Sequence, residues 1–122
     1  MAPTSLFDNA LGQSVAYVVG SELDDTTGWV TVENATQDSM CISIHVASKG
    51  TSGVQVDVRL FDSGTTDWVY LIKNGPVPVG STLVVIDNNK IVIKAGQSID
   101  VRCKTPGEDV DVLVSLVDNV NA

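Results

Sequence analysis

Alternation of apolar and polar residues with a period of two is the feature of this sequence that most limits its possible folds. From Val54 to Leu60 every second residue is a valine or a leucine, and the residues between them are Gln55, Asp57 and Arg59. Successive side chains of a β-strand point to opposite faces, so this pattern predicts a strand with one face in a core. No long stretch carries the 3.6-residue period of an amphipathic helix.

Similar runs recur along the chain, separated by turn-forming residues at the spacing typical of a sandwich or barrel. The apolar residues are largely Val, Ile and Leu, which suit a pleated, half-buried surface. We therefore expect an all-β fold, an antiparallel β-sandwich (Ig-like or jelly-roll-like) of about eight or nine short strands. Residues 1–13 are expected to form an N-terminal arm and residues 14–122 a single β-sandwich domain. The expected strands are residues 14–20, 28–34, 40–47, 54–61, 68–73, 82–86, 90–94, 98–103 and 109–117.

Two connections carry specific turn signals. Asn88-Asn89 suits a two-residue primed turn, because asparagine tolerates positive φ better than most residues. This predicts a hairpin between the strands expected at residues 82–86 and 90–94. Pro76 and Pro78 cannot donate to a β-ladder, so residues 75–80 are expected to form a connection or the edge of a sheet.

The charge balance limits the partners. Fifteen acidic residues against seven basic ones give a net charge of −8, and the basic residues are scattered. Binding to a phosphate backbone requires several cations in one patch, so nucleic acid and an anionic membrane are both unfavourable partners. No segment has the roughly 20 apolar residues of a membrane span. Met1 to Gln13 lacks the basic and apolar regions of a signal peptide, so we expect synthesis in a cytoplasm without export.

His45 is the only histidine and the first candidate for catalysis or zinc binding. Alternation places it with Ser43 and Cys41 on one face of a strand, which superficially suggests a triad. Residues in a line on one strand do not form an activated nucleophile, so the favoured interpretation is a polar face exposed to solvent or to a neighbour. The sequence contains no nucleophile elbow, no Cys-x-x-Cys pair and no Gly-rich phosphate loop. We expect no enzyme activity, no cofactor and no bound metal.

Two acidic groups are candidate cation sites. Calcium prefers several oxygen ligands from a short loop, but neither group has the alternating spacing of a known loop motif. Solvated turns are therefore the favoured interpretation. The groups are Glu22, Asp24 and Asp25 in one loop and Glu108, Asp109 and Asp111 in another.

The two cysteines are expected to lie on different sides of their strands. Cys103 continues the inward face of Ile99 and Val101, so it is expected to be a small buried hydrophobe. Cys41 alternates with Ile42 and falls on the polar face. This arrangement favours two free thiols over a bridge within the chain. A disulfide between subunits, through Cys41 or Cys103, remains open if the protein reaches oxidising surroundings.

Several aromatic and proline residues are candidates for contact. Trp29 shares its face with Thr31 and Glu33, and an exposed tryptophan can stack on a sugar, although core packing or a subunit contact is favoured. Residues 68–72 and 83–86 are apolar on both faces, more than one core needs, and neighbouring copies would cover the excess. We therefore expect a homo-oligomer. The candidate interface residues are Trp29, Trp68, Tyr70, Pro76, Pro78 and Leu113.

The stretch from Val69 to Val117 resembles a family of small structural proteins of tailed-bacteriophage particles. The shared elements come in the same order, from a Tyr-Leu-hydrophobic-Lys strand and a proline-bearing link to a closing Val-Asp-Val strand. They cover about two fifths of the chain, and the two cysteines depart from the family pattern. The matching segments are residues 70–73, 76–81, 83–85, 90–96 and 110–115.

The resemblance implies a β-sandwich that coats or joins parts of a virion. As a function it implies a non-enzymatic capsid decoration or cement protein, or a neck-collar component. The implied partners are other copies of the chain and other virion proteins of the capsid, neck or tail. The alternative is a carbohydrate-binding or host-adhesion module, which would need an exposed aromatic shelf centred on Trp29. The position in the particle and the symmetry of the oligomer remain open.

Overall fold

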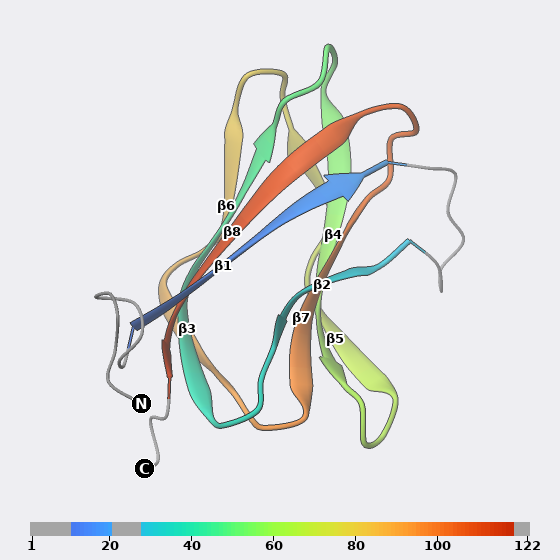
Figure 1. The fold of residues 1–122 in the computed structure, drawn as a ribbon. Helices are drawn as coiled ribbons and strands as arrows, with labels where there is room; N and C mark the ends of the chain where they lie inside the picture. The colour runs from blue at the N-terminus through green and yellow to red at the C-terminus, as the bar shows by residue number, and fades with distance from the viewer. Residues whose placement is uncertain (1–10, 21–27, 119–122) are drawn as a thin grey trace.

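The structure is a computed structural model that describes residues 11–20 and 28–118. Within these ranges the chain forms eight β-strands and no helix, and every strand pairing is antiparallel. Figure 1 shows the strands as a twisted sandwich, and the predicted antiparallel β-sandwich is confirmed. The strands are β1 (Leu11–Val19), β2 (Val30–Asn34), β3 (Ser39–Ser48), β4 (Val54–Asp62), β5 (Asp67–Val77), β6 (Thr82–Ile93), β7 (Gln97–Cys103) and β8 (Asp109–Asp118).

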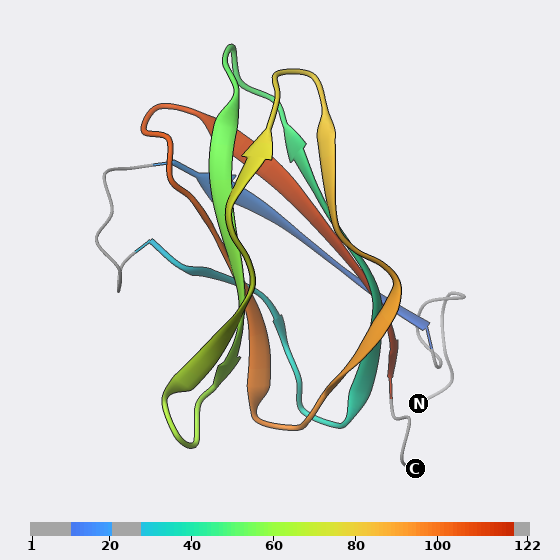
Figure 2. The ribbon, with the colours of Figure 1, turned by 180° about the vertical axis from the view of Figure 1, so that it is seen from behind.

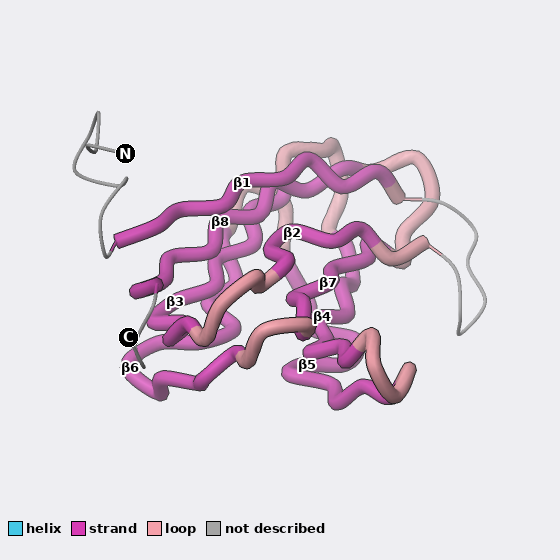
Figure 3. Tube along the Cα trace, turned by 60° about the horizontal axis from the view of Figure 1, so that its bottom comes forward, coloured by secondary structure: helices cyan, strands magenta, loops and turns pink. Residues whose placement is uncertain are grey.

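The strands divide equally between two sheets. Sheet A has the order β1-β8-β3-β6, and sheet B has the order β2-β7-β4-β5. Figure 3 shows these two stacks of strands facing one another. Consecutive strands change sheet at every step except from β4 to β5. This is the strand order of an eight-stranded jelly roll, so of the two expected sandwich types the jelly roll is the one that forms.

The core lies between the sheets and is built from the inward rows that the alternation predicts. Full burial of one valine or isoleucine side chain contributes roughly 1.5–3 kcal/mol to stability. Many such side chains are fully buried here. The predominance of β-branched residues also suits their strand positions, because these side chains have few χ1 rotamers to lose. The buried apolar residues are Val18, Ala35, Cys41, Ile44, Val46, Val54, Val56, Val58, Val77, Ile86, Ile93, Ile99, Val101, Cys103, Val110, Val112, Val114 and Leu116.

The hairpin predicted at Asn88-Asn89 is wrong. Residues 82–93 form the single strand β6 at one edge of sheet A, and Figure 2 shows it as one long, bent ribbon. Both halves of β6 pair with β3, the first with residues 43–47 and the second with residues 39–41. A hairpin would instead require the two halves to pair with each other. Asn88 and Asn89 therefore lie where the pairing of β6 with β3 is irregular.

The two prolines lie at a sheet edge, as predicted. Pro76 is within β5, the edge strand of sheet B, and Pro78 follows that strand. Gly75 is buried beside Pro76, and a Cβ atom there would lie 2.7 Å from Ile72 Cδ1 and 2.9 Å from Leu83 Cδ2. Because Leu83 belongs to sheet A, the small residue lets the edge of sheet B approach the other sheet closely.

The start of the sandwich differs slightly from the prediction. β1 begins at Leu11, so the expected arm of residues 1–13 overlaps the strand by three residues. The rest of that arm, and the acidic loop with Glu22, Asp24 and Asp25, lie outside the described residues. Among the residues that the structure describes, no helix is long and apolar enough to cross a membrane.

Candidate functional site

The outer face of sheet A exposes a group of large apolar side chains. On β1, alternation leaves Val15, Tyr17 and Val19 outside the core, with 71%, 53% and 54% of their surfaces exposed. Soluble monomers usually expose large apolar residues singly, whereas a contiguous patch marks a contact surface. We name this surface the apolar face, and it comprises Val15, Tyr17 and Val19 of β1, Leu113 of β8, and Val84 of β6.

One row of the apolar face crosses the whole sheet. Val15 lies opposite Leu113, Leu113 lies opposite His45, and His45 lies opposite Val84. A groove of about 530 Å³ lies over this row. Its surface is concave and mostly apolar. The groove is lined by Val15, Ala16, Tyr17, His45, Ala47, Thr82, Asp111, Val112 and Leu113.

His45 lines this groove without a polar partner. Its imidazole makes no hydrogen bond or ion pair with any residue in the described part of the chain. Asp111 also lines the groove, but its carboxylate lies 2.8 Å from Lys49 Nζ. Among the described residues no group of three or more His, Cys, Asp or Glu residues could hold a metal ion. Among the described residues that line the groove, no hydrogen bond joins His45 to a hydroxyl or a thiol.

A polar cluster borders the groove at the β1 end. Tyr17 donates its hydroxyl proton to Asp109 Oδ2 at 2.7 Å, and Lys49 Nζ lies 3.9 Å from the centroid of the Tyr17 ring. The hydrogen bond to Asp109 raises the pKa of Tyr17, and the bond to Asp111 raises the pKa of Lys49. The positive charge of Lys49 is thus compensated, and Tyr17 is held in place on the apolar face.

Glu108, which belongs to the second acidic group, binds the loop between β3 and β4. Its carboxylate accepts hydrogen bonds from the backbone N–H of Thr51 at 2.9 Å and from the hydroxyls of Ser52 and Thr51 at 2.8 and 3.2 Å. These hydrogen bonds lower the pKa of Glu108, and the bond from Ser52 has the largest effect. The three carboxylates of this group, Glu108, Asp109 and Asp111, each bind a different protein donor.

Both cysteines are free thiols, and both are buried. Cys103 faces the core as predicted, but so does Cys41, which corrects its predicted place on the polar face. The pairing of β3 shifts register between Cys41 and Ser43, and such a bulge reverses the alternation of faces. Burial raises the pKa of the Cys41 thiol to about 11 and also raises the pKa of Cys103. An inter-subunit disulfide through Cys41 or Cys103 is inconsistent with this burial.

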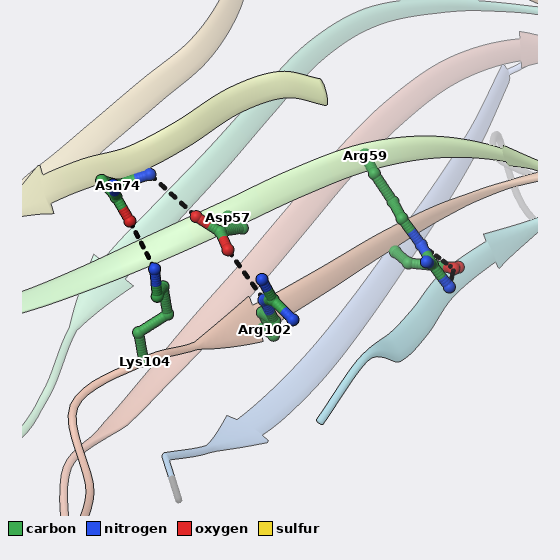
Figure 4. A network of polar contacts seen from close by, with 6 residues as sticks. Asp57, Arg59, Asn74, Arg102 and Lys104 are labelled. Carbon is green, nitrogen blue, oxygen red and sulfur yellow. Dashed lines mark hydrogen bonds and ion pairs between the residues drawn. The ribbon is translucent and has the colours of Figure 1, made fainter. Parts of the chain in front are cut away.

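The outer face of sheet B carries two ion pairs that are buried although they lie outside the core. Arg102 Nε donates to Asp57 Oδ2 at 2.7 Å, and Arg59 Nε donates to Asp100 Oδ2 at 2.8 Å. Asp57 also accepts a hydrogen bond from the backbone N–H of Asn74 at 2.8 Å. Figure 4 shows Asp57 between Asn74 and Arg102, with Arg59 further along the same strand. The outward direction of these residues agrees with the alternation, but they are not exposed to solvent.

Aromatic rings cover these charges. The guanidinium carbons of Arg59 and Arg102 lie 4.2 and 4.4 Å from the centroid of the Trp29 ring. That of Arg59 also lies 4.5 Å from the Phe61 ring and 4.8 Å from the Trp68 ring. A guanidinium over an aromatic face gains about 0.5–2 kcal/mol, depending on its exposure. The outer side of sheet B is therefore a second packed layer, made of arginine, aspartate and aromatic side chains.

A depression of about 270 Å³ lies beside Trp29 on this face. Thr31 and Ser98 each donate a hydroxyl proton to Asp100 at 2.9 Å, so their donors are already used. Trp29 is only partly exposed, and two guanidinium groups lie over its ring, so it does not form an open shelf. The depression is lined by Trp29, Thr31, Asn34, Arg59, Phe61, Ser63, Gly96, Ser98 and Asp100.

The predicted interface residues lie in three separate places. Trp29, Trp68 and Tyr70 lie on the outer side of sheet B, where the rings of Trp29 and Tyr70 are 6.1 Å apart. The two prolines line a shallow depression at the β5 edge. Leu113 belongs to the apolar face of sheet A. The structure does not bring the six residues into one surface.

Two features of the site were missed from the sequence although the signals for both are present. Residues 15–19, VAYVV, are apolar at consecutive positions, so no choice of inward face could bury all of them. The tripeptide Asp-Val-Arg occurs at residues 57–59 and again at residues 100–102. When two such tripeptides pair antiparallel, each aspartate faces an arginine, and β4 and β7 pair in this register.

No protein family and no curated protein matches this chain. Among solved structures it is similar to a Podospora anserina GH26-CBM35 β-(1,4)-mannanase, with 11% sequence identity and a TM-score of 0.40. The similarity covers 93% of this chain and 29% of the mannanase chain, so this chain spans less than a third of that protein. A similarity at this TM-score carries no argument about what the chain does.

Proposed function

We propose that this chain is a non-enzymatic structural protein of a bacteriophage particle, either a capsid decoration or cement protein or a neck-collar component. In this role it oligomerises and binds neighbouring virion proteins. The observation that carries the contact role is the apolar face of sheet A, where Val15, Tyr17 and Val19 are more than half exposed. Covering that surface gains roughly 25 cal/mol for each Å² of apolar area removed from water. The assignment to a phage particle rests on the sequence resemblance of residues 69–117.

The fold is compatible with this role but does not select it. Jelly rolls occur in viral capsid proteins and equally in lectins, and one fold serves many functions. The proposal therefore depends on the surface of sheet A and on the absence of an assembled catalytic group among the described residues that line its groove.

The first experiment asks whether the chain is part of a particle. Particles of the phage that encodes it are banded on a density gradient, washed in high salt and analysed by quantitative mass spectrometry. We expect the chain to remain with the particles at a fixed ratio to the major capsid protein. Recovery only in the soluble fraction of the lysate would contradict the proposal.

The second experiment tests the apolar face directly. Particles that lack the chain are mixed with purified wild-type protein, with Val84→Asp or with Val79→Asp. Val84 lies on the apolar face, whereas Val79 is exposed in the connection between β5 and β6 and serves as the matched control. We expect Val84→Asp to reduce rebinding and Val79→Asp to rebind like the wild type. Equal rebinding of all three proteins would exclude the apolar face as the binding surface.

As a second candidate function we propose carbohydrate binding or host adhesion through the depression beside Trp29 instead of an open aromatic shelf, because the depression combines two aromatic residues with polar side chains. Small-molecule sites are concave, largely apolar and fitted with a few polar groups that fix orientation. Asn34 and Ser63 are exposed there and face solvent-accessible space. Sugar binding in this depression needs only one chain, whereas the structural role needs contacts with neighbouring chains.

A glycan array separates the two candidates. If the depression binds a sugar, the wild type will give reproducible signals that Asn34→Ala weakens and Val79→Ala leaves unchanged. No signal for the wild type, or an Asn34→Ala variant that binds like the wild type, would remove the second candidate.

A further inference from the structure

The described sheets have four edge strands, and three of them are protected against pairing with another strand. Edge strands expose unpaired N–H and C=O groups, and proteins usually block them with short length, charge, proline or bulges. β2 has only five residues and a register shift. β5 contains Asp67, Lys73 and Pro76, and its register with β4 shifts twice. β6 contains Lys90, and its register with β3 also shifts twice.

β1 has none of these protections. Its nine residues, LGQSVAYVV, include no charged residue and no proline. Its register with β8 is unbroken from Leu11 opposite Val117 to Val19 opposite Asp109. The other side of β1 is therefore a regular ladder of backbone groups that no described strand pairs with.

We propose that β1 pairs antiparallel with β1 of a second copy of this chain, so that two copies of sheet A form one continuous eight-stranded sheet. This deepens the proposed function and rests on it for the expectation that copies meet. The partner is a second copy because, about a two-fold axis, the same uncharged and regular strand can supply both sides of the contact. Each copy carries a net charge of −8, so two copies repel each other wherever acidic side chains meet. β1 presents an uncharged strand to its counterpart.

The length of β1 fixes the register. The midpoint of Leu11–Val19 is Val15, so a two-fold axis at Val15 pairs all nine residues of both strands, and any other symmetric register pairs fewer. The same register keeps Val15, Tyr17 and Val19 of both copies on one side of the joined sheet, because odd-numbered residues then face odd-numbered residues. Val15, the most exposed large apolar residue, meets its own counterpart at the axis.

Sedimentation equilibrium over micromolar to submillimolar concentrations tests the pairing. We expect the wild type to have twice the 12.9 kDa mass of one chain. Val15→Lys places two ammonium groups at the axis and is expected to raise the dissociation constant by about tenfold or more. Val84→Lys lies on the same face but on β6, and it is expected to dimerise like the wild type. A wild type that stays monomeric, or a Val84→Lys variant impaired as strongly as Val15→Lys, would overturn the pairing.

Crosslinking keeps the test independent of the stability of the lysine variant. Paired antiparallel residues have Cα atoms about 4.5–5.5 Å apart, within the range that a disulfide spans. Val15→Cys is therefore expected to form a covalent dimer on mild oxidation, and Val84→Cys is not. Cys41 and Cys103 are buried and do not compete. Equal crosslinking of the two variants, or none in Val15→Cys, would contradict the register.

The two proposals fail in different ways. A chain that is monomeric in solution but present in purified particles would overturn the β1 pairing and leave the structural role standing. A chain that dimerises through β1 but is absent from particles would overturn the structural role alone.

Discussion

Arg102 Nε lies 2.7 Å from Asp57 Oδ2 across strands β7 and β4, and both side chains are almost completely buried although they point away from the core. The pairing follows from the repeated tripeptide Asp-Val-Arg, which also brings Arg59 to Asp100. Removing charges from water is costly, so such groups persist only when each finds a partner and further hydrogen bonds. Trp29 completes the enclosure by packing on both guanidinium groups.

Asp57→Asn is expected to destabilise the protein strongly. The substitution removes the carboxylate charge that faces Arg102 Nε, and loss of one member of a buried ion pair typically costs about 3–5 kcal/mol. The measurement is urea unfolding followed by fluorescence or circular dichroism. Asp67→Asn, at an exposed position on β5, is the control and should change the free energy of unfolding by less than about 0.5 kcal/mol.

A double variant distinguishes loss of pairing from loss of packing. Asp57→Leu combined with Arg102→Met removes both charges, and apolar replacement of a buried pair is often neutral. The double variant is therefore expected to be more stable than Asp57→Asn. If it is equally unstable, the ion pair is not the source of the effect.

The two native thiols are expected to be unreactive in the folded protein. Burial raises the pKa of Cys41 to about 11 and also raises that of Cys103, so little thiolate forms near neutral pH. A disulfide-exchange reagent should modify both thiols only as fast as the chain unfolds, whereas Val84→Cys should add one thiol that reacts at once. Because the thiol pKa values are higher in the folded state, the favourable effect of the two protonated thiols on stability is present below the ordinary thiol pKa of 9.0. It is lost as pH rises towards 11. Rapid modification of two thiols in the folded wild type would refute the burial.

Glu108 should make the loop at residues 50–53 sensitive to acid. Its pKa is lowered in the folded state, chiefly by the hydrogen bond from Ser52, so its contribution to stability is present above the ordinary carboxyl pKa of 4.5. That contribution is lost as pH falls through the lowered value. Thermal unfolding between neutral and acidic pH should show a smaller loss of stability in Glu108→Gln than in the wild type over that window. Parallel pH profiles for the two proteins would contradict this role of Glu108.

Gly20 is expected to tolerate no side chain. A Cβ atom there would lie 2.0 Å from the carbonyl oxygen of Thr105 and 2.7 Å from that of Glu108. Gly20→Ala should therefore lower the free energy of unfolding by about 1–3 kcal/mol. Gly53→Ala is the matched control, since its nearest neighbour, the carbonyl oxygen of Val77, is 3.5 Å away. Similar stability of the two variants in urea would show that the end of β1 can shift away from the β7–β8 loop.

The sandwich could be predicted from the sequence because alternation determines which face of a strand is buried. Val54, Val56 and Val58 face the core as expected, and so do Ile99 and Val101. The alternation fails where the register shifts. The bulge beside Cys41 turned an expected surface thiol into a core residue, and a bulge has no signature in the period-two pattern.

The pairing of strands was harder to predict than their existence. Asn88-Asn89 has the composition of a turn, but the long neighbour β3 pairs with the residues on both sides of it. Burial on the outer side of sheet B was also not predictable from polarity, because Asp57 and Arg102 are shielded by their pairing and by Trp29. The exposed row on β1 was accessible from the sequence, since five consecutive apolar residues cannot all face one core.

A reconstruction by electron cryomicroscopy of the particle that carries this chain would show what covers the apolar face. We expect density for the jelly roll in which the apolar face of sheet A lies against neighbouring chains, with β1 continued by a further strand. In that map Val15 and Tyr17 should be within contact distance of another protein. A map in which the outer face of sheet A points to solvent, with no chain within reach of those two residues, would show that the apolar face is not a contact surface.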